Sequence, residues 1–136
     1  MVMVTSKMET QKIKLAIVVL NWNGKKWLSK FLPTLINNSE GGVVFLADNA
    51  SSDDSIDFVR TNFPEINIII NDDNFGYAKG YNKALKQINA DYFVLINSDI
   101  EVKKGWIEFI MTLMDKDLDI AACQPKILDY NNKGKF

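Results

Sequence analysis

A run of apolar residues that ends in amide, hydroxyl and carboxylate side chains is the feature of this chain best suited to chemistry. Residues 92–96 read Tyr-Phe-Val-Leu-Ile, and Asn97, Ser98 and Asp99 follow directly. A continuous apolar run of this kind predicts a parallel strand buried on both faces by helices. Ligands of such sheets collect beyond the carboxyl ends of the strands. The carboxylate of Asp99 is therefore placed to bind a metal ion and, through it, a phosphorylated substrate.

Polar residues also follow the three preceding predicted strands. These strands cover residues 13–20, 43–47 and 66–70. The residues that follow them are Asn21, Asp48, and Asn71 with Asp72. Because parallel strands end at the same edge of a sheet, we expect these side chains to lie near Asn97 and Asp99. Asparagine and aspartate also form turns and cap helices, so each strand end taken alone has a purely structural explanation.

Segments with helical periodicity separate the strands. They span about residues 25–38, 53–63, 77–88 and 106–114, and a fifth short strand is expected at 120–123. This alternation predicts right-handed βαβ crossovers and a mostly parallel sheet with helices on both faces, a three-layer α/β/α fold. Ser51 and Ser52 are the expected N-caps of the second helix. Tyr77, Tyr81 and Cys123 are assigned to the buried core.

The composition is that of an ordinary globular domain of 136 residues, with 47% hydrophobic and 24% charged residues. A net charge of −1 without clustered basic residues argues against nucleic-acid binding. The chain has no histidine and one cysteine, which excludes an internal disulfide, His-ligated zinc and imidazole catalysis. We expect one domain over residues 13–136, preceded by a flexible leader over residues 1–12.

The sequence favours a cytoplasmic location. The first twelve residues lack the apolar core of a secretory signal, and no segment is apolar for long enough to span a bilayer. A single cysteine fits a reducing compartment. Peripheral contact with the inner face of the membrane is compatible with these observations.

An oxygen-rich site without histidine or cysteine favours Mg²⁺ or Mn²⁺ as its cation. The chain has neither a P-loop nor a G-x-G-x-x-G motif after its first strand, so phosphate charge must be met by a cation and by side chains. Asp48 could accept a hydrogen bond from a base or ribose, or serve only as a turn residue. Trp22 could stack on a planar base, or pack against the first helix. Lys79 could reach a phosphate, or remain solvated.

Four motifs in sequential order strongly resemble the family-2 glycosyltransferases, and most closely their rhamnosyltransferase-like branch. They are residues 16–23 (AIVVLNWN), 47–55 (ADNASSDDS), 74–82 (NFGYAKGYN) and 95–102 (LINSDIEV). The resemblance covers residues 13 to about 128. It implies a GT-A fold, the Rossmann-like fold of nucleotide-diphospho-sugar transferases. It also implies an inverting transfer of sugar from a UDP- or dTDP-linked donor to a hydroxyl of a glycan or lipid-linked acceptor, as in cell-wall or capsule polysaccharide synthesis.

The resemblance also implies a site. The nucleotide-sugar-binding residues would be Leu20, Asn21, Trp22, Asp48, Gly76, Lys79, Asn82, Asn97 and Ser98. Leu20 and Trp22 would flank the base, and Asp48 would bind its polar edge. Asp99 would be the metal ligand, because Asn97-Ser98-Asp99 takes the place of the family's DXD motif with asparagine at its first position.

Family members continue well past this point, and their catalytic base and acceptor-binding segment lie in the later part. We therefore expect a chain shortened at its C-terminal end, in which no residue can be named as the base. Two functions stay open: the donor-binding portion of a glycosyltransferase, and a catalytically inert nucleotide-binding or assembly module. A sheet edge and apolar surface left uncovered would favour self-association.

Overall fold

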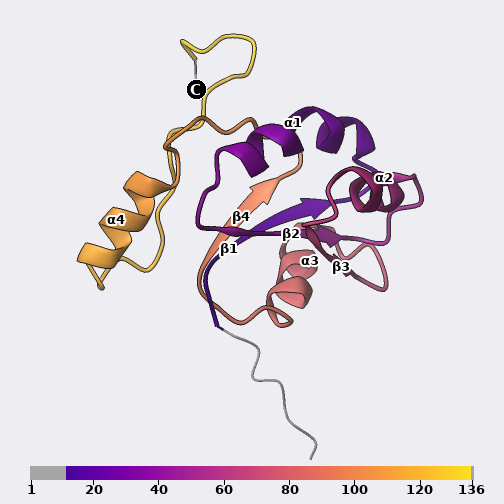
Figure 1. Cartoon of the computed structure of the whole chain (residues 1–136), viewed down its shortest axis with the longest axis horizontal. Helices are drawn as coiled ribbons and strands as arrows, with labels where there is room; N and C mark the ends of the chain where they lie inside the picture. Colours follow the sequence, from indigo (N-terminus) through magenta and orange to yellow (C-terminus); the bar gives the residue numbers. More distant parts are fainter. Residues whose placement is uncertain (1–11, 136) are drawn as a thin grey trace, which may run out of the picture.

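The computed structural model of the chain describes residues 12–135, and residues 1–11 of the expected leader lie outside them. Its strands are β1 (Ile13–Asn21), β2 (Val43–Asp48), β3 (Asn67–Ile70) and β4 (Ala90–Asn97). Its helices are α1 (Lys25–Asn37), α2 (Ser55–Asn62), α3 (Gly76–Leu85) and α4 (Glu108–Lys116). The strands form a parallel sheet in the order β3-β2-β1-β4 (Figure 1). The predicted parallel α/β sheet is confirmed.

Helices cover both faces of the sheet because the central strand β1 is apolar on both of its sides. Leu15, Ile17 and Val19 pack with residues of α1 and α2. Ala16 and Val18 pack with residues of α3 on the opposite face. The two apolar clusters therefore sandwich the sheet, as the expected three-layer arrangement requires.

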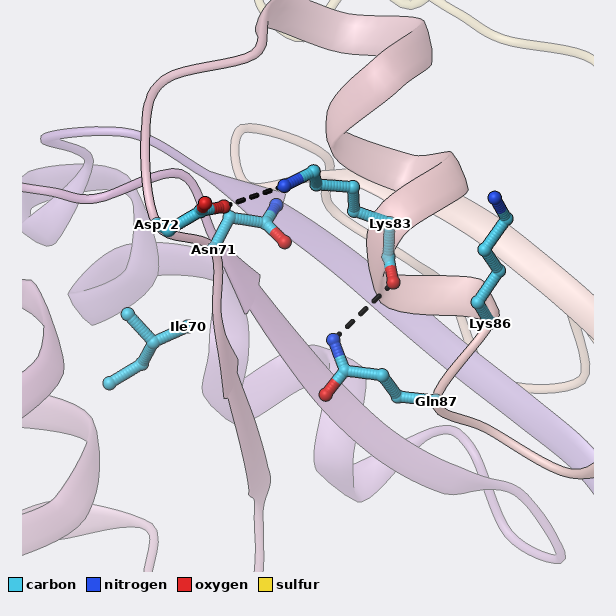
Figure 2. A pocket seen from close by; sticks show the side chains of 6 residues that line it. All are labelled: Ile70, Asn71, Asp72, Lys83, Lys86 and Gln87. Carbon is cyan, nitrogen blue, oxygen red and sulfur yellow. Dashed lines mark hydrogen bonds and ion pairs between the residues drawn. The ribbon is translucent and has the colours of Figure 1, made fainter.

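Two polar contacts fix α3 in place. The Lys83 ammonium lies 2.7 Å from a carboxylate oxygen of Asp72, in the loop after β3 (Figure 2). The Tyr81 hydroxyl donates to the backbone oxygen of Ile96 in β4 at 2.9 Å, and burial raises the pKa of Tyr81 well above its ordinary value. Placing Tyr81 in the core is confirmed. Placing Tyr77 there is wrong, because its ring is largely exposed.

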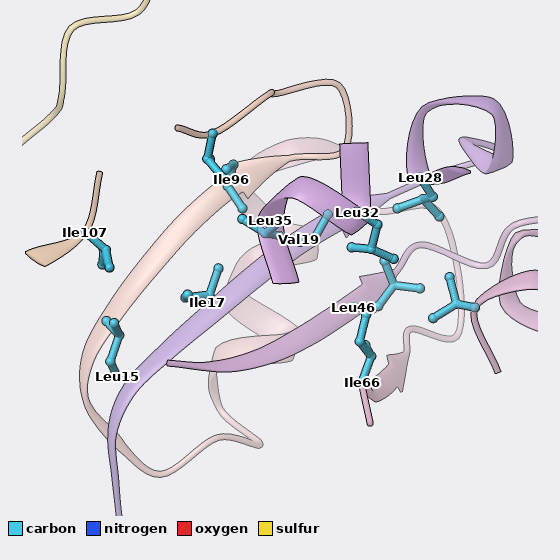
Figure 3. Close-up of a cluster of buried hydrophobic side chains, with 12 residues drawn as sticks. Leu15, Ile17, Val19, Leu28, Leu32, Leu35, Leu46, Ile66, Ile96 and Ile107 are labelled. Atoms are coloured by element: carbon cyan, nitrogen blue, oxygen red, sulfur yellow. The ribbon is translucent and has the colours of Figure 1, made fainter. Parts of the chain in front are cut away.

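The larger apolar cluster lies between the sheet and α1 (Figure 3). Leu28, Leu32 and Leu35 form one buried stripe of α1, at the spacing that places side chains on the same face of a helix. Leu46 of β2 and Val59 of α2 complete the same layer and are fully buried. This layer fixes the start of α1, and with it the loop that follows β1.

β4 is not buried on both faces, contrary to the expectation. It is an edge strand that pairs with β1 alone, and its burial alternates along its length. Tyr92 and Val94 pack against the larger apolar cluster, whereas Phe93 and Leu95 are 39% and 46% exposed. One face of β4 is left open because α3 lies mainly over β1 and β2. An apolar run in the sequence does not show whether a strand will be covered or will lie at the edge of the sheet.

The expected strand at residues 120–123 is not formed. Within the described part of the chain these residues have no regular secondary structure, and Cys123 is exposed rather than buried. The Ser51 and Ser52 caps are also wrong. α2 begins at Ser55, whose backbone N–H and hydroxyl donate to the Asp53 carboxylate.

None of the residues of α4 is fully buried, although Met111 packs partly buried against the core, and one carboxylate ties the helix to the sheet. Asp115 accepts hydrogen bonds from the Lys14 ammonium at 2.8 Å and from the Tyr92 hydroxyl at 3.0 Å. The Lys14 bond, followed by the Tyr92 bond, lowers the pKa of Asp115. Both partners belong to the sheet, so this contact carries α4 against the β4 side of the domain (Figure 1).

We expect α4 to loosen when Asp115 loses its charge. A depressed folded-state pKa means that the contact contributes above the unfolded-state value of about 3.9 and is lost as pH falls through the lower folded value. Hydrogen exchange should show protection of residues 108–116 falling several-fold in Asp115→Ala. The wild-type protein should lose the same protection upon acidification.

The matched control is Asp119→Ala, which removes a neighbouring exposed carboxylate that accepts no hydrogen bond within the described residues. Equal protection of α4 in both variants and in the wild type would show that apolar contacts alone hold the helix.

Candidate functional site

The carboxyl ends of the strands meet at one edge of the sheet, as expected. The register pairs Asn21 with Asp48, and Leu20 with Asn97. The backbone N–H of Asn71 donates to the backbone oxygen of Asp48 at 2.8 Å. The structure therefore brings together the four polar strand ends that the sequence singled out.

Asp48 is fully buried, and its carboxylate is occupied by protein donors. Its oxygens accept hydrogen bonds from the Asn21 side-chain amide at 2.8 Å, the Ser51 backbone N–H at 2.8 Å and the Ser51 hydroxyl at 2.7 Å. A buried carboxylate is tolerated only when such partners compensate its lost hydration. Asp48 thus fastens the loop after β2 to the end of β1.

Asn23 strengthens the same fastening from the other loop. Its side-chain oxygen accepts hydrogen bonds from the backbone N–H groups of Ser52 at 2.7 Å and Asp53 at 3.2 Å. Its own backbone N–H donates to the Ser51 hydroxyl at 2.8 Å. The serines that look like helix caps in the sequence are therefore parts of a clamp between two loops.

Asn49 and Asn71 form a second buried network that sequence reasoning did not find. The Asn71 amide donates to the Asn49 side-chain oxygen at 2.7 Å, and the Asn49 amide donates to the Gly76 backbone oxygen at 2.9 Å. A Cβ at Gly80 would lie 2.7 Å from the Asn49 amide, so only glycine fits there. The signal in the sequence was a pair of asparagines at neighbouring strand ends, followed by two glycines four residues apart.

Other expected site residues are open to solvent. Trp22 is 57% exposed. Gly76, Lys79, Asn82, Asn97 and Asp99 are also exposed, and Leu20 and Ser98 are half-buried. The Lys79 ammonium lies 4.3 Å from the centre of the Phe75 ring, at the start of α3. Buried members of the expected site thus hold loops, and exposed members are available to a ligand.

Gly24 lies where the loop after β1 approaches the loop after β4. A Cβ at Gly24 would lie 2.2 Å from the Asn21 side-chain oxygen and 3.3 Å from the Ser98 hydroxyl. The Asn21 oxygen is buried without a hydrogen-bond partner among the described residues. The absence of a side chain at Gly24 therefore lets Asn21 stay beneath the loop that carries Asp99.

Two hollows lie near these residues. A pocket of about 470 Å³ is lined by Ile70, Asn71, Asp72, Lys83, Lys86 and Gln87 (Figure 2). The Lys83 hydrogen bond lowers the pKa of Asp72, so these two of the three charged residues in the pocket pair with each other. A second pocket of about 280 Å³ has Asp99 in its wall.

A resident metal cluster has no support among residues 12–135, where no three carboxylate, cysteine or histidine side chains converge on a metal-sized space. Asp99 is a single exposed carboxylate beside the exposed amide of Asn97. Mg²⁺ is commonly held by one or two carboxylates together with the phosphates of a substrate. The residues present thus fit a cation that is bound jointly with a diphosphate.

A parallel α/β sheet with polar side chains at the carboxyl ends of its strands is typical of Rossmann-like folds, which bind their ligands at that edge. The family described as "Glycosyl transferase family 2" matches residues 16–135, and the chain belongs to that family. The expected family membership is therefore confirmed.

Relatives support the same conclusion. A Haemophilus influenzae protein described as an uncharacterized glycosyltransferase is 25% identical over an alignment of 114 residues, which covers 79% of this chain and 34% of the relative. The chain thus spans about a third of the length of the curated relative it matches.

Within the described residues, each helix is too short or too polar to cross a membrane.

Solved structures share the fold. S. aureus TarS 1-349 in complex with UDP has a TM-score of 0.66 and 21% identity, covering 76% of this chain and 32% of that chain. The mannosyltransferase PcManGT from Pyrobaculum calidifontis, in complex with GDP-Man and Mn²⁺, has a TM-score of 0.59 and 19% identity, covering 68% of this chain and 29% of that chain. The expected GT-A fold is confirmed.

We expect the Asn49→Ala variant to be destabilised by about 1–3 kcal/mol. The substitution removes one of the two acceptors of the buried Asn71 amide, and it removes the donor that bonds to the Gly76 backbone oxygen. Urea unfolding monitored by circular dichroism would measure the change in the free energy of unfolding.

Asn89→Ala is the matched control, since the Asn89 side chain is exposed and makes no hydrogen bond within the described chain. Its free energy of unfolding should stay within about 0.5 kcal/mol of the wild type. Equal stability of the two variants would contradict a structural role for the asparagine network.

Proposed function

We propose that this chain is the donor-binding portion of an inverting glycosyltransferase that uses a nucleotide-diphosphate sugar. The observation that carries the proposal is the position of Asp99. Its carboxylate is exposed, has no hydrogen-bond or ion-pair partner among residues 12–135, and follows β4 at the edge where the polar strand ends meet. Family membership makes this edge the natural place for the diphosphate of a sugar donor.

The nucleotide would lie across the loops that the two buried networks hold. Trp22 offers an exposed ring on which a base can stack, beside the half-buried Leu20. In this proposal Asp48 and Asn21 support the site without touching the nucleotide. Their side chains are buried and hold the loop that carries Ser51.

Two further groups would complete the donor site. Gly76, Lys79 and Asn82 are exposed at the start of α3, where an ammonium and an amide can meet phosphate or ribose oxygens. Asn97 and Ser98 would contribute polar groups on the side of β4. The donor would be a UDP- or dTDP-linked sugar, and structural neighbours that bind UDP and GDP-Man support a nucleotide-sugar ligand.

Asp99, with Asn97 beside it, would hold Mg²⁺ or Mn²⁺ together with the diphosphate. When bound, such a cation neutralises the charge that develops on the leaving diphosphate. A structural neighbour contains Mn²⁺ with its nucleotide sugar, which supports the choice of metals.

The acceptor would be a hydroxyl of a glycan or a lipid-linked sugar, in the cytoplasm or at the inner face of the membrane, during polysaccharide synthesis. Inverting transfer needs a carboxylate base that removes the proton of that hydroxyl. We assign no residue of this chain to that role.

A second candidate function is a catalytically inert assembly module with the same fold. The open edge of β4 and the exposed side chains of Phe93 and Leu95 favour an assembly module, because strands with an unpaired apolar edge associate readily. Assays of sugar transfer and donor hydrolysis separate the two candidates, since turnover excludes an inert module.

Asp99→Ala should abolish the Mn²⁺-dependent part of UDP binding, because it removes the carboxylate assigned to the cation. Isothermal titration of the chain with UDP, with and without Mn²⁺, should show metal enhancement of at least about tenfold, or about 1.4 kcal/mol, in the wild type. The variant should bind UDP equally in both buffers.

Asp119→Ala is the control here as well and should keep the full metal effect. Metal-enhanced binding that survives Asp99→Ala would place the cation elsewhere. Absence of UDP binding in the wild type would remove the support for a donor site.

A further inference from the structure

The pocket beside Asp99 has walls of a distinctive chemistry. It is lined by Trp27, Lys30 and Phe31 of α1, by Asp99, and by Tyr130 and Asn131 of the C-terminal segment. Three aromatic rings, a carboxylate, an amide and an ammonium therefore meet around a space of about 280 Å³. Segments about a hundred residues apart in the sequence are brought together to build it.

The aromatic rings of the pocket pack against one another. Phe31 is buried and forms the base, with its ring nearly parallel to Trp27 at 6.2 Å between centres. Tyr130 meets Phe31 edge to face at 5.5 Å. The Lys30 ammonium lies 4.2 Å from the centre of the Tyr130 ring, an attractive cation–π distance that holds the ring against α1.

The loop that supplies Tyr130 has a defined shape of its own. The Asp129 carboxylate accepts hydrogen bonds from the backbone N–H groups of Asn131 at 2.9 Å and Asn132 at 2.6 Å. The Lys135 backbone N–H closes the turn by donating to the backbone oxygen of Asn132 at 2.9 Å. Tyr130 and Asn131 are thus presented to α1 by a hydrogen-bonded turn.

The pocket leaves both apolar and polar surface open to a ligand. Trp27 is 41% exposed and Tyr130 is 48% exposed, so part of each ring is free. Asp99 offers acceptors, Lys30 offers donors, and the Asn131 amide offers both. A pyranose ring matches this arrangement, because it has an apolar C–H face for an aromatic ring and a rim of hydroxyls for charged and amide groups.

The size of the pocket supports the same ligand. Pockets for drug-sized ligands begin at about 300 Å³, and this one lies just below that range. It is matched to a single sugar ring rather than to a whole nucleotide. Its common wall at Asp99 places such a ring next to the edge where we propose the diphosphate to lie.

We propose that this pocket binds one sugar ring, stacked on Trp27 and Tyr130 and hydrogen-bonded by Asp99, Lys30 and Asn131. The inference rests on the proposed function for the source of the ring, which is either the sugar of the donor or the terminal sugar of the acceptor. The pocket itself can be tested without any nucleotide.

The test is saturation-transfer NMR of the 136-residue chain with methyl glycosides of glucose, N-acetylglucosamine, mannose and rhamnose. We expect saturation of ring C–H protons by at least one glycoside. Trp27→Ala and Tyr130→Ala should each weaken its binding about three- to tenfold, the range measured for aromatic contacts. Tyr130→Phe keeps the ring and should bind within about twofold of the wild type.

Phe109→Ala is the matched control, because it removes an equally large exposed ring on α4 that does not line the pocket. It should leave glycoside binding unchanged. Circular dichroism of each variant confirms that the fold is retained.

Competition identifies the source of the ring. Displacement of the glycoside by UDP-GlcNAc or GDP-mannose, but not by UDP or GDP, assigns the pocket to the donor sugar. Glycoside binding that survives all four nucleotides assigns it to the acceptor sugar. Either result supports a sugar site.

Three results would overturn the inference: no saturation of any glycoside, wild-type glycoside affinity in both Trp27→Ala and Tyr130→Ala, or an equal loss of UDP and glycoside binding in those variants. Failure of UDP to bind the wild type is a separate result. It would contradict the proposed donor site while the glycoside titrations still report on the pocket.

Discussion

The buried carboxylate of Asp48 is the constraint from which the candidate site follows. A charge removed from water is retained only if donors surround it, and here those donors come from the end of β1 and from the loop after β2. The carboxylate therefore requires both segments to keep their positions. Its position at the end of a central strand lets one charge organise two loops, since β1 and β2 are neighbours in the sheet.

The asparagine network holds the loop after β3 and the start of α3 in a similar way. Asn49 follows Asp48 in the chain but bonds to Asn71 and to the first residue of α3. Adjacent residues at the end of β2 thus hold different loops. A ligand at this edge would meet loops that are already fixed, which lowers the entropic cost of binding.

Sequence reasoning predicted the fold well, because β1 and the helices have strong apolar periodicity. It failed at β4 and at residues 120–123, where burial depends on which neighbours are present rather than on the residues themselves. Tyr77 follows the spacing of the α3 stripe, yet it is 59% exposed and meets the ring of Tyr81 edge to face. Local patterns report the face of an element, and tertiary arrangement decides how much of that face is covered.

The polar strand ends were predicted to lie together, and they do. Their individual tasks could not be read from the sequence, because a buried Asp48 and an exposed Asp99 have the same side chain and both follow apolar strands. Ser51 resembles a helix cap, but its hydroxyl serves a carboxylate three residues earlier. Only the three-dimensional neighbours of each side chain show whether it holds a loop in place or is exposed to a ligand.

The two walls of the aromatic pocket differ in origin, and this has an evolutionary consequence. One wall belongs to a helix whose opposite stripe is locked into the core, so its geometry changes little without loss of stability. The other is a turn outside the sheet, closed by its own hydrogen bonds. Insertions or replacements in that turn can reshape the pocket while the folded core stays intact, so selectivity can diversify independently of the scaffold.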